Sequence, residues 1–209
     1  MQFKLPEVYP ITDKQLARKT SQLCIIKELV RGGARIVQIR DKYTSLRELM
    51  PDLYRCMEFA SNKGVVLIIN DRCDLALSCN ASGVHLGQED IPPEQARLIM
   101  GREKILGFSN HTLAQVRQSA RLPIQYIGFG PVYATSTKAT PYPTVGLHKL
   151  ALACRESALP VVAIGGIGLE QVRDVLQAGA ASAAVISALM KAKSLAREME
   201  KFLEKAREK

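Results

Sequence analysis

The chain has 209 residues, of which 47% are hydrophobic and 23% are charged, and its formal net charge is +9. This composition is typical of a globular protein, and the length suffices for one large domain with its own core. Aromatic residues make up only 5% and tryptophan is absent, so the sequence offers no stacking surface for nucleic acid bases, and we expect no nucleic-acid partner.

Short apolar runs rich in β-branched residues alternate with amphipathic segments along the whole chain, which predicts alternating strands and helices. The strands are predicted at Val8–Thr12, Ile36–Arg40, Val65–Asn70, Gly83–Leu86, Ile105–Ser109, Tyr126–Phe129, Val161–Ile164 and Ala183–Ser187. One helix is predicted from Asp13 to the Gly32-Gly33 pair, and the others at 45–63, 72–79, 94–100, 113–120, 146–157, 169–178 and 194–207.

Two of the helix starts carry capping patterns. Ser45 has Glu48 three residues later, which predicts a capping box, and Thr112 stands before the helix at 113–120. At the other end of the helix that Ser45 begins, Gly64 is expected to stop it.

Eight strands, each followed by a helix, predict a single-domain (β/α)8 TIM barrel that covers residues 1–209. The main alternative is a doubly wound open sheet. That fold usually has fewer strands in a chain of this length, and no GxGxxG pattern follows the first predicted strand.

Cysteine usage and hydropathy predict where the protein works. The five cysteines form no CxxC pair and mostly have apolar neighbours, which indicates reduced thiols. The longest uncharged apolar stretch, 178–190, has 13 residues and is too short to cross a bilayer. We expect a soluble, cytoplasmic protein with no membrane partner. The sequence leaves the oligomeric state open, including a homo-oligomer.

The ends of the predicted strands carry charged side chains in an informative arrangement. In a β/α barrel the chemistry takes place at the C-terminal ends of the strands. Asp71 and Asp90 come from the ends of neighbouring strands, and Arg40, Lys42 and Lys138 from others. Mg²⁺ takes one or two protein oxygens and completes its coordination with water and phosphate oxygens. These side chains are therefore what Mg²⁺ plus a diphosphate requires, although ordinary salt bridges would use the same residue types.

A second group of small residues indicates a monophosphate site. Gly165-Gly166 and Ile186-Ser187 end the seventh and eighth strands, the usual phosphate position in these barrels. Separately, the long segment after Phe129 carries hydroxyl groups at Thr135 and Thr137, and clustered donors after a strand suit an anion. Tight packing around glycine is the alternative explanation for the first pair. No strand end offers a Ser-His-Asp set, an activated cysteine or a pair of metal-binding histidines, and the three histidines are expected to be structural.

The sequence resembles the thiamine phosphate synthase family over nearly its whole length. The motifs that carry the resemblance are YPITD (9–13), VQIRDK (37–42), NDRCDLAL (70–77), GVHLGQED (83–90), LGFSNHT (106–112), YIGFGPVYATSTK (126–138) and VAIGGI (162–167). The resemblance implies a β/α barrel that joins 4-amino-2-methyl-5-hydroxymethylpyrimidine diphosphate to 4-methyl-5-(2-phosphoethyl)thiazole, or its carboxylated form. The products are thiamine phosphate and pyrophosphate, and the cofactor is Mg²⁺.

The resemblance also implies roles for individual residues. It assigns the pyrimidine diphosphate to Gln38, Arg40, Lys42, Asn70 and Lys138. It assigns the metal to Asp71 and Asp90, and the thiazole phosphate to Thr135, Thr137, Gly165, Ile186 and Ser187. Ser109 matches a serine near the reacting centre, and Ser109, Arg40 and Lys138 are the expected catalytic residues. The family often has an Asp-Pro pair after the eighth strand, where this chain has 189–193.

Two other functions fit the same resemblance. Thiazole tautomerases of the sister group share the barrel. The resemblance implies that they carry a proton-transferring histidine at the position where this chain has Pro131. A protein that only binds thiamine intermediates would be expected to lose a metal carboxylate, and here Asp71 and Asp90 are both present. We therefore expect a synthase.

Overall fold

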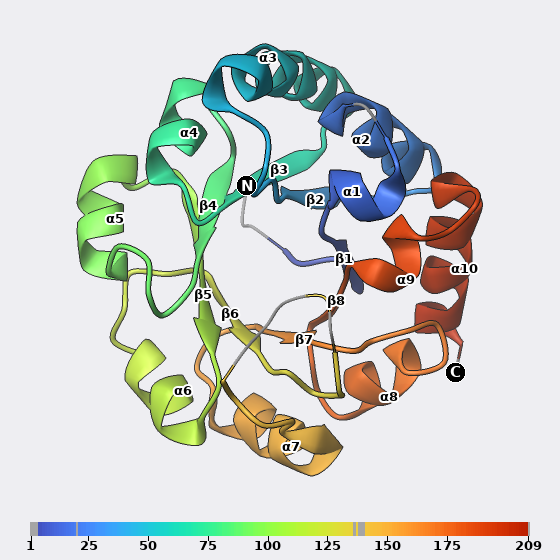
Figure 1. Ribbon diagram of the computed structural model, residues 1–209. Coiled ribbons are helices and arrows are strands. Elements are labelled where there is room, and N and C mark those ends of the chain that lie inside the picture. Colours follow the sequence, from blue (N-terminus) through green and yellow to red (C-terminus); the bar gives the residue numbers. More distant parts are fainter. Residues whose placement is uncertain (1–3, 20, 136, 138–140, 209) are drawn as a thin grey trace.

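The computed structural model describes residues 4–19, 21–135, 137 and 141–208, and it is a closed ring of parallel strands surrounded by helices (Figure 1). The strands are β1 (Val8–Pro10), β2 (Ile36–Ile39), β3 (Val66–Asn70), β4 (Gly83–Leu86), β5 (Ile105–Asn110), β6 (Tyr126–Phe129), β7 (Val161–Ile164) and β8 (Ser182–Val185). They form one sheet in the order β1-β8-β7-β6-β5-β4-β3-β2. The predicted barrel is thereby confirmed.

The ring closes between the first two strands. An isolated parallel bridge joins Ile11 to Gln38, and the Thr12 N–H donates to the Gln38 carbonyl oxygen at 2.8 Å. Thr12 also accepts a hydrogen bond at Oγ1 from the Arg40 N–H, at 3.1 Å. These contacts complete the circle, so the C-terminal ends of all eight strands meet at one rim.

The helices follow the strands in sequence. They are α1 (Lys14–Ala17), α2 (Gln22–Arg31), α3 (Leu46–Lys63), α4 (Cys73–Ser78), α5 (Pro93–Met100), α6 (Leu113–Ser119), α7 (Gly146–Glu156), α8 (Val172–Gln177), α9 (Ser187–Met190) and α10 (Leu195–Arg207). Figure 1 shows α1 and α9 lying inside the outer circle of helices, close to β1 and β8. Both short helices therefore lie near the point where the barrel closes.

The core has two parts. The larger cluster packs the outer faces of the strands against the helices and includes Ile25, Leu53 and Leu106. The smaller cluster fills the interior of the barrel with Tyr9, Tyr126 and a few aliphatic side chains. The two tyrosines are essentially unexposed, so their hydroxyl groups must find partners within the protein.

Three local predictions were wrong. The single helix expected from Asp13 is two helices, because Arg18 ends α1 in a left-handed conformation (φ 50°) and Ser21 caps α2 anew. Ser45 precedes α3 but makes no side-chain cap hydrogen bond, so the expected capping box is absent there. The eighth strand ends at Val185, and Ser187 begins α9 instead of closing the strand.

Other helix ends were predicted correctly. Thr112 and Gln115 form a capping box at α6. Gly64 adopts the left-handed conformation (φ 62°) that ends α3.

The Thr12 hydrogen bond at the closure is testable. We expect Thr12→Val to lower the free energy of unfolding by about 1–3 kcal/mol, because it leaves the Arg40 N–H without its acceptor. Thr12→Ser keeps the hydroxyl and is the matched control, with a smaller loss in urea unfolding. Equal losses in the two variants would show that the hydrogen bond contributes nothing.

Candidate active site

Two carboxylates lie together at the rim, where β3 and β4 end. Asp71 directly follows β3, and its N–H donates to the His85 carbonyl oxygen at 2.8 Å, which ties it to β4. Its φ of 65° is uncommon for a residue with a side chain. Asp90 lies in the loop after β4 and accepts a hydrogen bond at Oδ2 from the Gly87 N–H, at 2.7 Å. A positive φ at a residue with a side chain, as at Asp71, is a form of backbone strain that is concentrated at functional sites.

The closeness of the two carboxylates is visible in their electrostatics. Burial raises the pKa of Asp90, and the neighbouring Asp71 carboxylate raises it further, both by repulsion and by a hydrogen bond between the two side chains. The hydrogen bond from Gly87 acts in the opposite direction. Two carboxyl groups held in contact form a suitable site for a hard cation. Such a cation binds carboxylate oxygens, and its positive charge offsets the repulsion between the two carboxylates.

Cations stand beside these carboxylates. Lys42 forms an ion pair with Asp71. The loop that carries Lys42 is held by Asp41, whose Oδ1 accepts from the N–H groups of Tyr43 and Thr44 at 3.2 and 2.9 Å. The loop thus holds the backbone next to Lys42 in place, and the ion pair with Asp71 holds the Lys42 side chain at the carboxylates.

Arg40 has a partner that the sequence did not reveal. Its NH1 group lies 2.9 Å from Asp13 Oδ2, and both side chains are largely buried. Asp13 also caps α1 by accepting from the Leu16 N–H at 3.0 Å. A carboxylate at this place could have been suspected from its position directly after the first predicted strand. Arg40 is consequently aligned before any ligand binds.

Two expected ligands of the diphosphate differ in how they are placed. Gln38 is buried on β2 and donates from Nε2 to the Tyr9 hydroxyl at 3.3 Å. Asn70 ends β3 half-buried, and within the described residues its side-chain amide makes no hydrogen bond. Lys138 lies outside the described residues.

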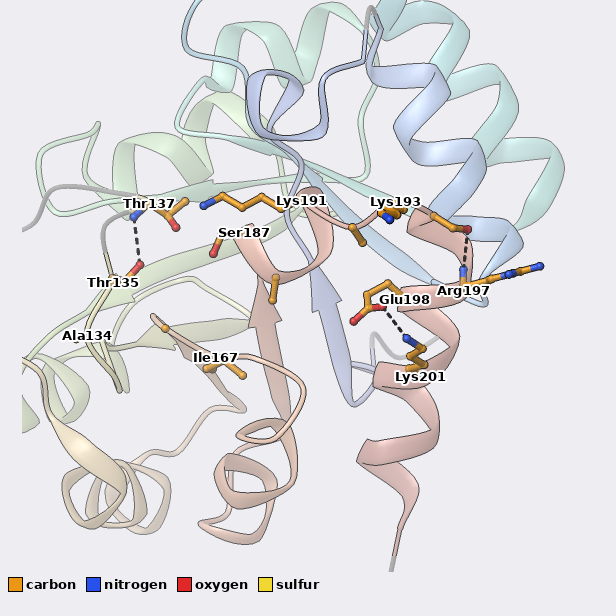
Figure 2. A pocket seen from close by; sticks show the side chains of 14 residues that line it. Ala134, Thr135, Thr137, Ile167, Ser187, Lys191, Lys193, Arg197, Glu198 and Lys201 are labelled. Atoms are coloured by element: carbon orange, nitrogen blue, oxygen red, sulfur yellow. Dashed lines mark hydrogen bonds and ion pairs between the residues drawn. The ribbon is translucent and has the colours of Figure 1, made fainter.

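On the opposite part of the rim there is a cavity of ≈ 820 Å³ (Figure 2). Its lining includes Thr135, Thr137, Gly166 and Ser187. The Thr137 N–H donates to Thr135 Oγ1 at 3.3 Å, which holds the two threonines together. The monophosphate residues predicted from the sequence thus come together around one cavity, apart from Gly165 and Ile186, which are not part of its described lining.

Gly165 lies against the segment that follows β6, as in the tight packing given above as the alternative. Its φ is 100°, and a Cβ there would lie 2.5 Å from the Pro131 Cβ. The Tyr133 N–H donates to the Gly165 carbonyl oxygen at 3.0 Å. The glycine therefore lets the segment after β6 pack closely on the end of β7, and this packing brings Thr135 to the cavity.

Sequence reasoning missed Lys191 as a member of this cavity. Figure 2 shows its side chain extending across the cavity toward Thr137. The Lys191 N–H donates to the Ser187 carbonyl oxygen at 3.1 Å, so the two residues are one turn apart at α9. Among the residues that the structure describes, Lys191 has no carboxylate partner, whereas Lys201 in the same cavity pairs with Glu198 at 3.2 Å. Residues 189–193 differ from the family pattern, and this difference was the sequence signal that could have drawn attention to Lys191.

Ser109 near the end of β5 lies next to a histidine. Its Oγ is 3.0 Å from His85 Nε2, and His85 Nδ1 is 3.0 Å from the Tyr126 hydroxyl. The serine and histidine are thus brought together, but in the described residues a tyrosine stands where a hydrolase would have its carboxylate. Burial raises the pKa of the nearby Cys73 thiol, with Asp74 and Asp90 adding to the rise, so this cysteine is not an activated nucleophile.

The remaining histidines are placed elsewhere. His111 Nδ1 lies 2.6 Å from the Gly130 carbonyl oxygen, and its ring stacks on Tyr142. His148 is exposed on α7. Among the described residues there is no group of three or more His, Cys, Asp or Glu side chains that could hold a metal ion. A pair of carboxylates is a ligand set that Mg²⁺ uses when water and phosphate oxygens complete its coordination.

The fold and the arrangement of charge at one rim define a β/α-barrel enzyme, and comparisons with known proteins give its family. The model of the thiamine monophosphate synthase family matches residues 8–189. A thiamine-phosphate synthase of Albidiferax ferrireducens is 41% identical over 182 residues, which cover 87% of this chain and 83% of that protein. One from Syntrophomonas wolfei is 40% identical over 195 residues, 93% of each chain.

Solved structures agree with this result. A thiamine phosphate pyrophosphorylase from Pyrococcus furiosus superposes with a TM-score of 0.86, at 31% identity and with 97% of each chain covered. The chain belongs to the thiamine monophosphate synthase family, and it is an enzyme, a transferase of thiamine biosynthesis. Within the described residues, no helix combines the length and the apolar character that crossing a membrane requires.

The contact between the two carboxylates predicts a stability effect. The pKa of Asp90 is above its ordinary 3.8 in the folded protein, so ionisation weakens the metal-free fold as the pH rises from 3.8 through the folded-state pKa. We expect Asp90→Asn to raise the melting temperature at neutral pH in a chelating buffer, and to have a smaller effect below pH 3.8.

Asp74→Asn is the matched control, because a hydrogen bond from Arg72 lowers the pKa of Asp74. This exposed residue should show no gain in melting temperature. A lower melting temperature for Asp90→Asn at neutral pH would mean that the carboxylate supports the fold.

Proposed function

We propose that this enzyme condenses 4-amino-2-methyl-5-hydroxymethylpyrimidine diphosphate with 4-methyl-5-(2-phosphoethyl)thiazole, giving thiamine phosphate and pyrophosphate. The observation that carries the proposal is the pair Asp71 and Asp90, held in contact at the rim with cations beside it. The named relatives, and the hydroxyl and basic side chains that line the cavity at Ser187, support the same reaction.

The diphosphate half of the reaction is assigned to the ends of β2, β3 and β4. Asp71 and Asp90 would hold Mg²⁺, which when bound would neutralise part of the charge on the departing pyrophosphate. Arg40 and Lys42 would bind the phosphate oxygens, and Asn70 would add a hydrogen bond from its amide. Lys138, known here from the sequence alone, is proposed as a further cation for the leaving group.

The reaction needs charge neutralisation and alignment more than a nucleophile. The amino group of the pyrimidine can stabilise a cation on the adjacent carbon as pyrophosphate departs, and the thiazole nitrogen then bonds to that carbon. Holding the two reactants in line supplies much of the rate in such a case. This chemistry agrees with the absence of an activated cysteine or a serine triad at the described rim.

The thiazole phosphate is assigned to the cavity on the opposite part of the rim. Thr135, Thr137 and Ser187 would donate hydroxyl hydrogen bonds to its oxygens, and Lys191 would supply charge. Lys193 and Arg197 line the same cavity, which also makes the carboxylated thiazole a candidate substrate.

The direct test combines both phosphorylated substrates with the purified enzyme and Mg²⁺. We expect thiamine phosphate and pyrophosphate to appear in equal amounts, and neither to appear when either substrate is left out. Conversion of the carboxylated thiazole by itself into an isomer would instead indicate a tautomerase.

The metal assignment predicts how two substitutions combine. Asp71→Asn and Asp90→Asn should each remove nearly all activity, with partial recovery at high Mg²⁺, because each keeps an oxygen but removes charge from a hard-cation site. The double variant should lose much less than the sum in free energy, since both residues act through one ion. Steady-state rates over a range of Mg²⁺ measure this.

Asp74→Asn controls for loss of a nearby surface carboxylate and should keep its activity. Thiazole phosphate binding by calorimetry should also survive both rim substitutions. Losses that add fully, without recovery at high Mg²⁺, would show that the two carboxylates do not share a metal.

Lys191 gives a second prediction for the phosphate cavity. We expect Lys191→Met to raise the KM for the thiazole phosphate about ten- to a hundredfold, because a hydrogen bond to a charged group is worth about 1.5–3 kcal/mol. Lys201→Met removes a lysine of the same cavity that already pairs with Glu198 and is the matched control. Equal changes in KM for the two variants would contradict the assignment.

A further inference from the structure

A continuous chain of four hydrogen bonds crosses the interior of the barrel. Gln38 Nε2 donates to the Tyr9 hydroxyl at 3.3 Å, and the Tyr9 and Tyr126 hydroxyl oxygens are 2.9 Å apart. The Tyr126 hydroxyl lies 3.0 Å from His85 Nδ1, and His85 Nε2 lies 3.0 Å from Ser109 Oγ. The chain thus joins β2 to β5 through β1, β6 and β4.

The packing around the chain is built to admit it. A Cβ on Gly107 would collide with the Tyr126 hydroxyl and lie 2.5 Å from His85 Nδ1, so the space next to β5 is kept free for these two side chains. The rings also fit one another, with His85 stacked on Tyr126 at 5.4 Å and Tyr9 edge-on to Tyr126 at 5.9 Å. Such packing leaves the hydroxyl groups few alternative positions.

The direction of each hydrogen bond in this chain follows from the Gln38 side-chain amide at its start. An amide N–H only donates, so the Tyr9 oxygen accepts from Gln38 and its hydrogen is left to donate to Tyr126. With its oxygen occupied by that hydrogen, Tyr126 can donate to His85 Nδ1 at 3.0 Å, and the histidine hydrogen then lies on Nε2, directed at Ser109 Oγ. The Ser109 hydrogen consequently remains for a ligand.

Both tyrosines keep their hydrogens at neutral pH. Burial raises the pKa of the Tyr9 hydroxyl, against smaller effects of its hydrogen bonds. Burial also raises the pKa of Tyr126, and Tyr9 adds to that rise. Each hydroxyl therefore carries one hydrogen, and one direction of donation can run through the whole chain.

We propose that Tyr9, Tyr126 and His85 are positioning residues that hold Ser109 as a hydrogen-bond donor toward the barrel mouth, where it takes an acceptor such as a ring nitrogen of an aminopyrimidine. The identity of that acceptor rests on the proposed function, whereas the direction of donation does not. His85 acts here as a donor to the serine, which is the reverse of the base in a hydrolase. Ser109 is the residue that touches the ligand.

The direction of donation can be measured without substrate. Long-range proton–nitrogen correlation spectra show which ring nitrogen of a neutral histidine carries the hydrogen. The protein has only three histidines, so few signals need to be assigned. His111 is a reference for the opposite tautomer, because its Nδ1 faces a carbonyl oxygen and must donate. We expect His85 to be protonated on Nε2 in the wild type, and to become a mixture of tautomers in Tyr126→Phe.

Kinetics then test whether the chain acts through Ser109. Tyr126→Phe should lower kcat about tenfold with little change in either KM, as expected for a lost hydrogen bond that matters mainly in the transition state. In an enzyme that already carries Ser109→Ala, the same change should lower kcat less than about threefold. Tyr133→Phe is the control, because the buried Tyr133 hydroxyl has no hydrogen-bond partner among the described residues.

The outcomes separate this proposal from the assigned reaction. A wild-type His85 protonated on Nδ1, or a spectrum unchanged by Tyr126→Phe, would overturn the proposal even if thiamine phosphate is formed. The expected spectra in an enzyme that forms no thiamine phosphate would support the direction of donation and overturn only the reaction. Full additivity of Tyr126→Phe and Ser109→Ala would show that the chain does not act through the serine.

Discussion

The closure of the sheet between β1 and β2 is the contact on which the site depends. An isolated bridge at Ile11 and the hydrogen bonds of Thr12 join these strands, and they turn a row of parallel strands into a ring. Once the ring is closed, residues far apart in the sequence share one rim. Asp13 can then align Arg40, and β3 and β4 bring Asp71 and Asp90 into contact.

The rim is divided by charge into two parts with different tasks. The ends of β2, β3 and β4 concentrate carboxylates and cations, which suits a metal and a diphosphate. The part near β6, β7 and α9 is lined by hydroxyl groups, glycine, three lysines and an arginine, which suits a monophosphate. Between them the interior of the barrel is polar along one line, from Gln38 to Ser109. A barrel interior is usually filled with aliphatic side chains, and here hydrogen bonds keep the buried polar groups satisfied.

The sequence predicted the barrel because the strand pattern repeats eight times, and most strand limits were within two residues of those observed. It failed where local signals compete, as at Arg18 and at Ser45, since the conformation of one residue or one rotamer decides these ends. For the site, position after a strand was enough to nominate Asp71 and Asp90. The partners of Arg40 and Ser109, and the reach of Lys191 across its cavity, depend on pairings between distant segments that periodicity does not encode.

A metal ion between the two carboxylates is the central proposal for this enzyme, and a crystal structure with Mn²⁺ and pyrophosphate would test it. Manganese replaces magnesium at oxygen sites and is located by its anomalous scattering. We predict one strong anomalous peak in contact with both Asp71 and Asp90, with the pyrophosphate bound between that ion and Arg40. Pyrophosphate bound at the rim with no ion at these carboxylates, or an ion bound elsewhere, would contradict the account.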